Sequence, residues 1–465
     1  MTFSIKDLYI QHRGSQYDLN EQYLNRQMVK VLRTIGYDKN YQKASGQYLY
    51  DQDNQEYLDL LSGFGVFAVG RNHPTIIQAL HDTMTMELPN LVQMDVSLLS
   101  GLLAKDILAT LPDTLTRMFF CNSGTEAVEA AIKFARYTTK RSKILYCDHG
   151  YHGLTMGALS LCGENVFRNG FGPLLPDCMS IPFNSLPALE EALRNRDIAA
   201  FIVEPIQGKG VILPDDDYFT EVARLCKQYG TLLVMDEVQT GIGRTGKFWA
   251  FEHWDVQPDM VLMAKALSGG FVPVGAVAMT QAIMDSVFSR MDRAVVHGST
   301  FAKNNLAMAA GLATLSVIKS ENLIANSAAI GTEIVQALNA QREQFEFLKE
   351  ARGKGLMLAI ELQPPKSIRL KAAWSLMETA QQGLFSQMIT IPLLQDHRIL
   401  AQVAGHGMNI IKFLPPLIIS AKDRDWIVSA LQHTLGDLHQ VGSSMWTLGK
   451  TLAKNALSAK QNANK

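Results

Sequence analysis

Short apolar segments alternate with longer amphipathic ones between residues 98 and 320. The apolar segments show no polar alternation, which is typical of strands that are buried on both faces. The clearest are KILYC (143–147), AAFIVE (199–204), TLLVM (231–235), DMVLMA (259–264) and PVGAVAM (273–279). Helix-like segments separate several of them, for example EAVEAAIKFAR (126–136) and YFTEVARLCKQYG (218–230). This order predicts an α/β fold with a mostly parallel sheet covered by helices on both faces.

The two ends of the chain follow other patterns. Residues 46–65 (GQYLYDQDNQEYLDLLSGFG) alternate apolar and polar positions on either side of DQDNQ, which predicts a hairpin. Beyond residue 325, helix-like segments alternate with GKGLMLAIEL (353–362) and MNIIKFLPPLIIS (408–420), as in a second, α+β domain. We therefore predict an N-terminal arm and hairpin that contributes to the small domain (1–60), a large domain (61–325), a C-terminal small domain (326–440) and a tail (441–465).

Composition excludes several classes of protein. The chain has 465 residues, of which 47% are hydrophobic and 19% charged, as in globular proteins. A formal net charge of −1 gives no reason to expect a nucleic acid partner. Charges in the first residues, MTFSIKDLYIQHRG, are unlike a signal peptide, and no apolar run reaches the roughly 18–20 residues of a membrane span. We expect a cytoplasmic protein.

Cysteine and histidine spacing gives no support for a metal site. The five cysteines are widely separated and form no C-x-x-C motif. This spacing favours free thiols in a reducing compartment over a disulfide frame or a zinc site. The histidines show no ligand spacing either, so we expect no metal.

The most conspicuous local motif is G-x-G-x-x-G at Gly241, Gly243 and Gly246, within DEVQTGIGRTG (236–246). In a dinucleotide-binding turn the first glycine stands directly at a strand end, and a helix begins within the motif. Here DEVQT separates the apolar run from Gly241, and the aromatic-rich KFWAFEHWD follows the last glycine. The sequence therefore favours a turn, with Arg244 bracing it, over a nucleotide site.

Charged residues follow three of the predicted strands. Glu204 follows AAFIV, Asp236 follows TLLVM and Lys265 follows DMVLMA. Ligands of parallel α/β sheets bind beyond the carboxyl ends of the strands, although an acid and a lysine there can also form a structural ion pair. Lys265 has no acid within five residues in sequence. A desolvated lysine has a lowered pKa and can attack a carbonyl carbon.

A phosphate-binding segment is also present. In FFCNSGTEAVEAAIKFAR (119–136) a short apolar run passes through Ser123, Gly124 and Thr125 into a strongly helical stretch. Glycine lets the backbone approach an anion at a helix N-terminus, although S-x-x-E is also an ordinary capping pattern. Combined with a lysine amine and a strand-end aspartate, the segment points to an aldehyde that carries a phosphate and a pyridine nitrogen. That cofactor is pyridoxal 5′-phosphate (PLP).

With these motifs the chain resembles the class III aminotransferases, the ornithine and ω-amino acid type of PLP fold type I. The matching segments cover nearly the whole chain in the family's order: YLYDQDNQEYLDLLSGFGV, FCNSGTEAVEAAIKFAR, GYHG, VEPIQG, DEVQTGIGRTGKFWAFEHWDVQPDMVLMAKALSGG, HGSTF and FLPPLIIS. The resemblance implies a seven-stranded sheet, PLP as cofactor, and a homodimer with shared active sites. It implies amino-group transfer between a small-molecule amine donor and a carbonyl acceptor.

The resemblance also implies roles at the reacting centre. Lys265 would bind the cofactor aldehyde and later move a proton between the substrate carbon and the cofactor. Asp236 would keep the pyridine nitrogen protonated. Gln239 would contact the phenolic oxygen and Tyr151 would stack on the ring, although either residue alone could serve packing or capping. His152 is interpreted either as a neighbour of the site or as structural.

The remaining cofactor residues surround that centre. Ser123, Gly124 and Thr125 would hold the phosphate, and Thr300 in HGSTF would reach the phosphate of the neighbouring subunit. Glu204 would be a nearby acid that does not contact the cofactor directly. These assignments also come from the resemblance.

The sequence departs from the family at positions that bind the substrate in its members. Lys209 stands where members that handle amino acids usually carry a glutamate after EPIQG, and Lys412 replaces the arginine of R-F-x-P-P. Lysine lacks the fork that binds a carboxylate bidentately. Phe64 lies where ornithine-type relatives often have tyrosine, and Phe67 follows it. We predict Phe64, Phe67 and Lys412 as substrate-binding residues.

These departures favour an apolar amine/aldehyde pair without an α-carboxylate, such as a long-chain pair of a biosynthetic pathway. The alternatives are an ornithine, acetylornithine, diamine or β-amino acid aminotransferase that uses pyruvate, or 2-oxoglutarate held by Lys412. An aminomutase or decarboxylase on the same fold is another alternative. A catalytically inactive regulatory or scaffold protein is the last, and the presence of both Lys265 and Asp236 argues against it.

The tail (441–465) has a basic, amphipathic pattern. No acid follows Asp437, and four lysines do: Lys450, Lys454, Lys460 and Lys465. Met445, Leu448 and Leu452 recur at helical spacing, with Trp446 nearby. One interpretation is weak contact with a membrane or a partner; the other is a frayed tail or a helix packed on the protein's own dimer.

Overall fold

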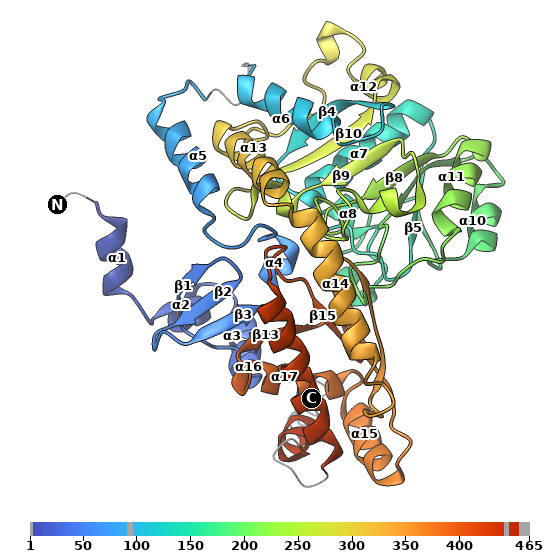
Figure 1. The fold of residues 1–465 in the computed structure, drawn as a ribbon. Helices are drawn as coiled ribbons and strands as arrows, with labels where there is room; N and C mark the ends of the chain where they lie inside the picture. Colours follow the sequence, from blue (N-terminus) through green and yellow to red (C-terminus); the bar gives the residue numbers. More distant parts are fainter. Residues whose placement is uncertain (1–2, 91–95, 441–445, 455–465) are drawn as a thin grey trace.

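A seven-stranded sheet forms the centre of the computed structural model, which describes residues 3–90, 96–440 and 446–454 (Figure 1). Its strand order is β4-β10-β9-β8-β7-β5-β6. All neighbours from β9 to β6 are parallel, and β10 runs antiparallel to β4 and β9. The strands are β4 (Leu115–Cys121), β5 (Lys143–Cys147), β6 (Cys178–Ile181), β7 (Ile198–Val203), β8 (Leu232–Asp236), β9 (Met260–Met263) and β10 (Gly275–Thr280). The predicted mostly parallel, seven-stranded sheet is confirmed.

Both faces of this sheet are buried, which explains the absence of polar alternation. In β7, Ala200 and Ile202 pack in the apolar cluster that contains α7, whereas Phe201 and Val203 belong to the cluster on the opposite face. The helices of this part are α6 (Leu98–Leu108), α7 (Gly124–Thr139), α8 (Met156–Leu159), α9 (Asn165–Arg168), α10 (Leu186–Leu193), α11 (Tyr218–Tyr229), α12 (Gln281–Val287) and α13 (Asn305–Ser320), with short turns η1 (Ala250–Trp254), η2 (Lys265–Ser268) and η3 (Met291–Arg293).

The N-terminal segment forms helices and the predicted hairpin. β2 and β3 pair antiparallel, and the Asp51 carboxylate closes their turn by accepting from the backbone of Asp53 and Gln55 at 3.0 and 2.9 Å. The elements are α1 (Ile5–Gln11), α2 (Gln16–Tyr23), α3 (Arg26–Thr34), β1 (Tyr41–Ser45), β2 (Tyr48–Asp51), β3 (Glu56–Asp59), α4 (Ser62–Gly65) and α5 (Pro74–Thr85). β3 also pairs in parallel with β13 (Ile399–Leu400), which joins this segment to the C-terminal part of the chain.

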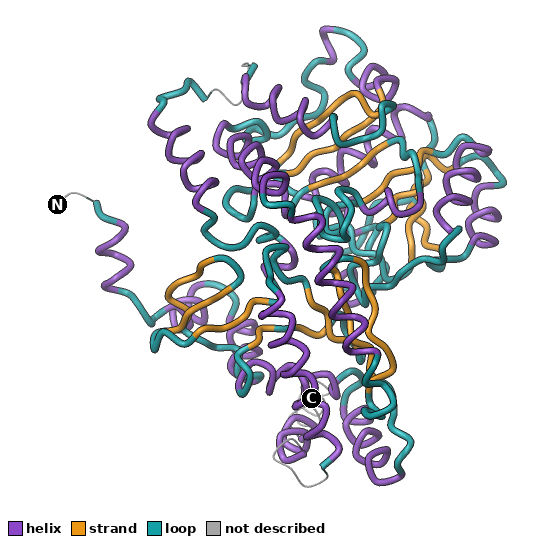
Figure 2. Tube along the Cα trace, in the orientation of Figure 1, coloured by secondary structure: helices purple, strands orange, loops and turns teal. Residues whose placement is uncertain are grey.

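The C-terminal part is α+β, as its pattern predicts. Its four-stranded sheet has the order β11-β12-β15-β14 and lies apart from the central sheet, in the lower group of strands in Figure 2. The elements are α14 (Leu323–Asn339), β11 (Leu348–Lys354), β12 (Met357–Leu362), α15 (Ile368–Ala380), η4 (Leu384–Ser386), α16 (Gln387–Gln395), β14 (Gln402–Val403), β15 (Ile410–Phe413) and α17 (Ala421–His439). The domain boundaries at residues 60, 325 and 440 stay predictions.

The structure corrects the membrane interpretation for the described part of the tail. Residues 446–454 are helical, and Trp446 and Leu452 are buried against the core of this chain. The indole of Trp446 donates to the Leu438 carbonyl at 3.2 Å, and Leu448 packs on the same cluster. This apolar side therefore contacts the protein's own core and not a membrane. Met445, Lys460 and Lys465 lie outside the described residues, and no helix in the described ranges is long and apolar enough to cross a membrane.

Candidate active site

A cavity of about 1460 Å³ lies beyond the carboxyl ends of the central strands. The ends of β7, β8 and β9 are neighbours in the sheet, so Glu204, Asp236 and Lys265 meet in its wall. The rest of the wall comes from α3, α4, the loops after β5 and β7, and the C-terminal sheet. Ligand pockets usually measure about 300–1,000 Å³, so this cavity has room for a cofactor and a substrate together.

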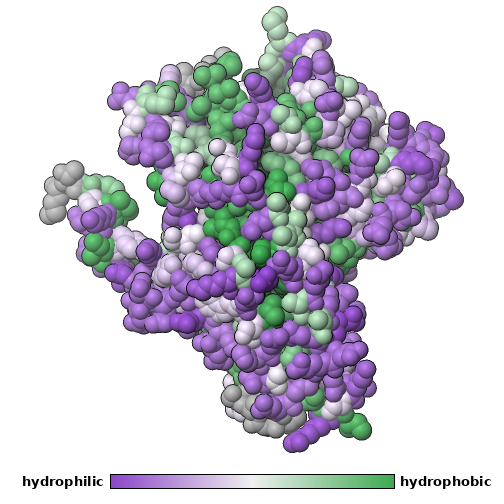
Figure 3. All heavy atoms as spheres, in the orientation of Figure 1, coloured by the Kyte–Doolittle hydropathy of each residue, from purple (hydrophilic) through white to green (hydrophobic). Residues whose placement is uncertain are grey.

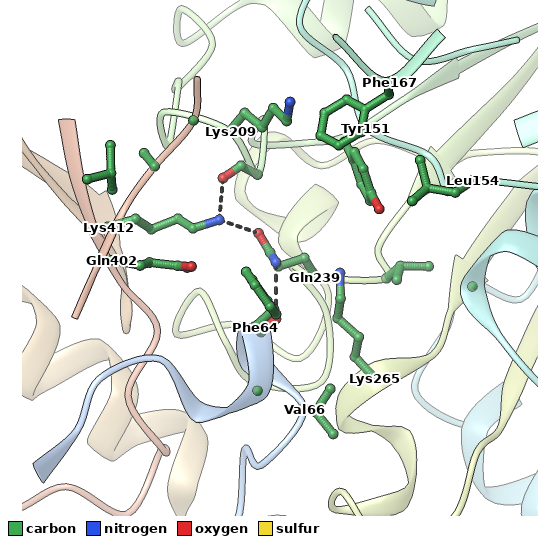
Figure 4. Close-up of a pocket in the computed structure, with 18 of the residues that line it drawn as sticks. Phe64, Val66, Tyr151, Leu154, Phe167, Lys209, Gln239, Lys265, Gln402 and Lys412 are labelled. Atoms are coloured by element: carbon green, nitrogen blue, oxygen red, sulfur yellow. Dashed lines mark hydrogen bonds between the residues drawn. The ribbon is translucent and has the colours of Figure 1, made fainter. Parts of the chain in front are cut away.

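Lys265 extends into the cavity from the floor seen in Figure 4. It is the first residue of η2 and has a φ of 43°, in the left-handed region, where a non-glycine residue is strained. Burial lowers the pKa of its ammonium group, and the charges of Asp236 and Glu204 oppose that shift. A lysine whose proton is held less tightly is a better nucleophile toward a carbonyl carbon.

Asp236 is held by two donors at the end of β8. One carboxylate oxygen, Oδ2, is 2.6 Å from His152 Nδ1, and the other accepts from the Val238 backbone at 3.1 Å. Burial by itself lowers the pKa of His152, but the hydrogen bond and the charge of Asp236 leave it raised overall. The imidazole therefore orients the carboxylate of Asp236. Of the two interpretations of His152, the geometry favours the neighbour of the site.

Glu204 is buried and connects two loops of the cavity wall. Its carboxylate accepts from the backbone N–H groups of Tyr151 at 3.3 Å and Gly208 at 2.7 Å. Burial raises the pKa of Glu204, and the nearby charge of His152 opposes this. The acid thus fixes the backbone beneath Tyr151, whose side chain lines the cavity.

The N-terminus of α7 opens into the same cavity. Ser123 is its N-cap and accepts from the Glu126 backbone at 3.3 Å, while Gly124 and Thr125 form the first turn. The first N–H groups of a helix have no acceptor within it and can bind an anion. A Cβ on Gly124 would lie 2.9 Å from Val238 Cγ1, so only glycine fits there. Ser123 is therefore both an ordinary cap and part of the predicted phosphate cradle.

Together these groups fit PLP. The cavity holds an anion cradle, a lysine amine with a lowered pKa, a carboxylate oriented by His152, and the ring of Tyr151. A phosphate, an aldehyde, a pyridine nitrogen and a ring face each find a complementary group among them. Bound PLP supplies an electron sink for bonds at the substrate carbon.

The substrate side of the cavity combines apolar side chains with Lys209, Gln239, Gln402 and Lys412. Phe64, Val66, Leu154 and Phe167 line it and appear around the chamber in Figure 4. Phe64 follows the left-handed turn at Gly63 and keeps about half of its surface exposed to the cavity side.

Phe67 does not line the cavity with Phe64, which corrects the expectation for this residue. Its ring lies under the guanidinium of Arg71, with 3.9 Å from the central carbon to the ring centroid. On its other side it packs against Gly270, where a Cβ would stand 2.3 Å from the ring. The ion pair of Arg71 with Asp59, at 2.8 Å, holds the guanidinium in this arrangement.

Lys412 lies on β15 and is buried. Its Nζ donates to the Gly208 carbonyl at 2.7 Å and to Gln239 Oε1 at 3.4 Å (Figure 4). Burial, reinforced by the charge of Lys265, lowers the pKa of Lys412 to about 7. Gln239 in turn donates to the Phe64 carbonyl at 3.1 Å. The structure thus ties Lys412 and Gln239 to each other and to the backbone of the wall.

Thr300 lies on the surface and outside the cavity of its own chain. The adjacent Ser299 accepts from Asn122 Nδ2 at 2.6 Å, which ties this loop to the start of α7. Contact of Thr300 with a partner's phosphate stays a prediction.

The glycine motif forms a turn. Gly243 and Gly246 have φ values of 87° and 82°, and Arg244 between them is buried. The Arg244 guanidinium donates to the carbonyls of Leu356, at 3.2 Å, and of Pro415. Arg244 therefore braces the turn against the C-terminal sheet, as the sequence suggests.

Sequence reasoning missed several residues of the wall. Phe167, Leu154 and Gln402 line the cavity, and Glu164 pairs with Lys209. None of them stands in a motif or at a predicted strand end, so no local signal identifies them. Within the described ranges, no group of three or more His, Cys, Asp or Glu residues is placed to hold a metal ion.

Comparison with known proteins identifies the family. Residues 34–435 match the model of the class III aminotransferases, so the chain belongs to this family and is a PLP-dependent enzyme of fold type I. Among curated proteins, it is 35% identical over 458 residues to the aminotransferase PigE of Serratia sp. (strain ATCC 39006). The match covers 92% of this chain and 54% of PigE, so the chain spans about half the length of that relative.

Solved structures give the same fold. The ornithine aminotransferase of Toxoplasma gondii superposes with a TM-score of 0.82 at 27% identity, covering 94% of this chain and 99% of that one. A PLP-bound amine transaminase from an uncultivated Pseudomonas species gives 0.74 at 28% identity, covering 86% and 96%. An (S)-enantioselective ω-transaminase from Thermomicrobium roseum gives 0.77 at 28% identity, covering 94% and 100%.

Proposed function

We propose that this chain transfers an amino group between an apolar amine and its aldehyde, a pair that lacks an α-carboxylate. The observation that carries the proposal is the substrate side of the cavity. Its wall includes Phe64, Val66, Leu154 and Phe167. Lys412, which replaces the family's arginine, is hydrogen-bonded to the Gly208 carbonyl of the protein itself. A lysine with a pKa of about 7 that already donates to Gly208 is a weak clamp for a carboxylate.

The residues at the other end would carry the chemistry. The free amine of Lys265 would move a proton between the substrate carbon and the cofactor, which would supply the electron sink. Asp236, oriented by His152, would place a negative charge at the pyridine nitrogen. The first-turn N–H groups of Gly124 and Thr125 would bind the phosphate, and Tyr151 would cover one ring face.

A homodimer completes the proposal. Around Thr300 the chain exposes Met291, Val295 and Phe301, with 96%, 76% and 65% of their surfaces accessible. The loop after α12 also shows hydrophobic atoms at the top of Figure 3. Such exposed apolar patches mark interfaces. A second copy seated there would cover this patch and bring its Thr300 toward the neighbouring cradle.

The alternative substrates are ornithine, acetylornithine, diamines or β-amino acids, with pyruvate or 2-oxoglutarate as acceptor. The structural likeness to an ornithine aminotransferase favours these amino acid substrates. The likeness to an amine transaminase favours the apolar amine. A catalytically inactive scaffold role fits poorly with a lysine and an aspartate placed for chemistry in one cavity.

Turnover of decylamine and of ornithine by the PLP-loaded protein tests the proposal. We expect a higher kcat/KM with decylamine, measured as aldehyde formed with pyruvate or 2-oxoglutarate as acceptor. Conversion of one acceptor keto acid to its amino acid for each aldehyde formed would exclude the decarboxylase and aminomutase alternatives. An equal or higher kcat/KM with ornithine would refute the apolar substrate class.

A further inference from the structure

A charged pair lies in the cavity wall beside two aromatic rings. Lys209, in the loop after β7, forms an ion pair with Glu164, the N-cap residue of α9, and each side chain is only 12% exposed. Lys209 lines the cavity, whereas Glu164 is not among the lining residues. The carboxylate therefore lies behind the lysine, as seen from the chamber.

The same ammonium group lies close to the faces of two rings. Its Nζ is 4.1 Å from the centroid of Phe167 and 5.9 Å from that of Tyr151. The two rings meet edge to face, with centroids 5.5 Å apart. A cation on an aromatic face and an edge-to-face ring pair are both attractive. In Figure 4, Lys209 lies above Lys412, with the rings of Tyr151 and Phe167 beside it.

The pair has a mechanical consequence for α9. This turn has four residues, none of them buried, so it has little packing of its own to hold it. The ion pair of Glu164 and the ring contacts of Phe167 connect it to the wall, and Arg168 at its end donates to the Tyr146 hydroxyl at 3.1 Å. Of these connections, the ion pair and the ring contacts are the ones that hold Phe167 beside the chamber.

We infer that Lys209 and Glu164 are positioning residues that set the substrate class, because they hold Phe167 against Tyr151 as an apolar wall and neutralise the lysine charge. The inference rests on the proposed function, since it explains how the chamber selects an apolar chain.

The charges that line the chamber support this reading. The lysines among the described lining residues are Lys30, Lys209, Lys265 and Lys412, and His152, also in the lining, is paired with Asp236. Lys265 is reserved for the cofactor, Lys412 donates to Gly208, and Lys209 is neutralised by Glu164. Lys30 is exposed on α3. A substrate carboxylate would gain a free, half-buried cation at Lys209 only if the Glu164 charge were removed.

Glu164→Gln tests this directly. We expect its KM for decylamine to rise and its KM for ornithine to fall, each by about 3- to 10-fold, the range of a desolvated cation–π contact. We expect kcat to change little. Glu191→Gln is the matched control, because Glu191 forms a surface ion pair with Arg194 at 2.8 Å, outside the residues that line the cavity. Equal effects of the two variants on both KM values would overturn the inference.

Two further variants separate the charge from the wall. Lys209→Arg keeps the cation and should preserve the wild-type ratio of the two KM values, whereas Lys209→Met should raise the KM for decylamine. Phe167→Ala should raise the KM for decylamine without lowering that for ornithine. A Lys209→Arg protein that behaves like Lys209→Met would refute the role of the cation, even if Glu164→Gln fails to fold.

This inference and the proposed function fail in different ways. If the wild type prefers ornithine but Glu164→Gln still changes the KM ratio, the pair sets specificity and the proposed substrate class is wrong. If the wild type prefers decylamine and Glu164→Gln changes neither KM value, the substrate class stands and the positioning role is wrong.

Discussion

The two ends of the cavity are built in different ways. The cofactor end comes from the carboxyl ends of β7, β8 and β9, which are adjacent strands of one sheet. The substrate end comes from α4, α9 and β15, which belong to separate parts of the chain. Strand pairing alone brings Glu204, Asp236 and Lys265 together, whereas the substrate end depends on how distant segments pack.

This difference has a chemical counterpart. At the cofactor end, buried charges have close partners of opposite charge or backbone donors, such as His152 at 2.6 Å from Asp236. Such pre-oriented groups are costly to remove, because the remaining partner stays buried without compensation. At the substrate end most contacts are apolar or involve neutral acceptors, as with Lys412 on Gly208, and the Lys209–Glu164 ion pair is the charged exception described above. We therefore expect mutations to stop the chemistry at one end and to redirect it at the other.

Replacing Lys265 with alanine is expected to have the largest effect. Loss of the amine that moves the proton should reduce kcat by roughly 10³-fold or more, since general acid–base groups contribute about 10²–10⁴-fold. The visible absorbance of the bound cofactor should also no longer respond to an added amine in the way it does in the wild type. Lys319→Ala, an exposed lysine on α13, is the control. Unchanged turnover would mean that another residue is the nucleophile.

The Asp236→Asn variant is expected to have the second largest effect. Its kcat should fall about 10²-fold, because an oriented charge in a buried site is lost. The change also leaves His152 without its charged partner, so the raised pKa of the imidazole should fall. Single-turnover absorbance measurements with decylamine would separate this loss from weaker binding. Asp216→Asn, on an exposed loop, serves as the matched control. A variant that keeps most of its kcat would contradict the role of the strand-end carboxylate.

The charge of Lys412, and any acceptor binding that depends on it, should change with pH. Its pKa is lowered to about 7 by burial, so the side chain is charged below that pH and neutral above it. If 2-oxoglutarate is held there, its KM should rise between about pH 6 and pH 9, while the KM for decylamine should not follow the same step.

Lys412→Arg sharpens the same comparison. Arginine stays charged and binds carboxylates bidentately, so the variant should lower the KM for 2-oxoglutarate at high pH by about 10-fold. Lys349→Arg, on the exposed side of β11, is the control. A pH-independent KM in the wild type would show that Lys412 does not hold the acceptor.

Phe64→Ala is expected to have the smallest effect. Phe64 is 54% exposed in the free cavity, so only part of its ring can gain from contact with a substrate. We expect kcat/KM for decylamine to fall by about 3- to 10-fold, less than full burial of a phenylalanine would give. Phe171→Ala, at a residue 62% exposed and outside the cavity lining, is the comparison. An equal loss with ornithine would mean that Phe64 supports the wall without selecting the substrate.

The sequence by itself determined five strands of the central sheet, the hairpin of β2 and β3, and the residues at the strand ends, whereas β6 (Cys178–Ile181) was not predicted. These features are local: runs without polar alternation specify strands buried on both faces, and a residue at a strand end reaches the edge where ligands bind. The start of α7 was equally readable, because capping depends on a few adjacent residues. Motifs of the family then connected Lys265 and Asp236 to a cofactor.

Only the tertiary structure decided which side chains complete the substrate end. Phe67 follows Phe64 by three positions, yet Arg71 and Gly270 hold its ring elsewhere. The tail has an amphipathic pattern, but the core of the same chain covers the apolar side of its described part. Lys209 and Glu164 meet across 45 positions of sequence. Spacing along a chain specifies periodicity and local caps, whereas contacts between distant segments depend on side-chain direction and packing that exist only once the chain has folded.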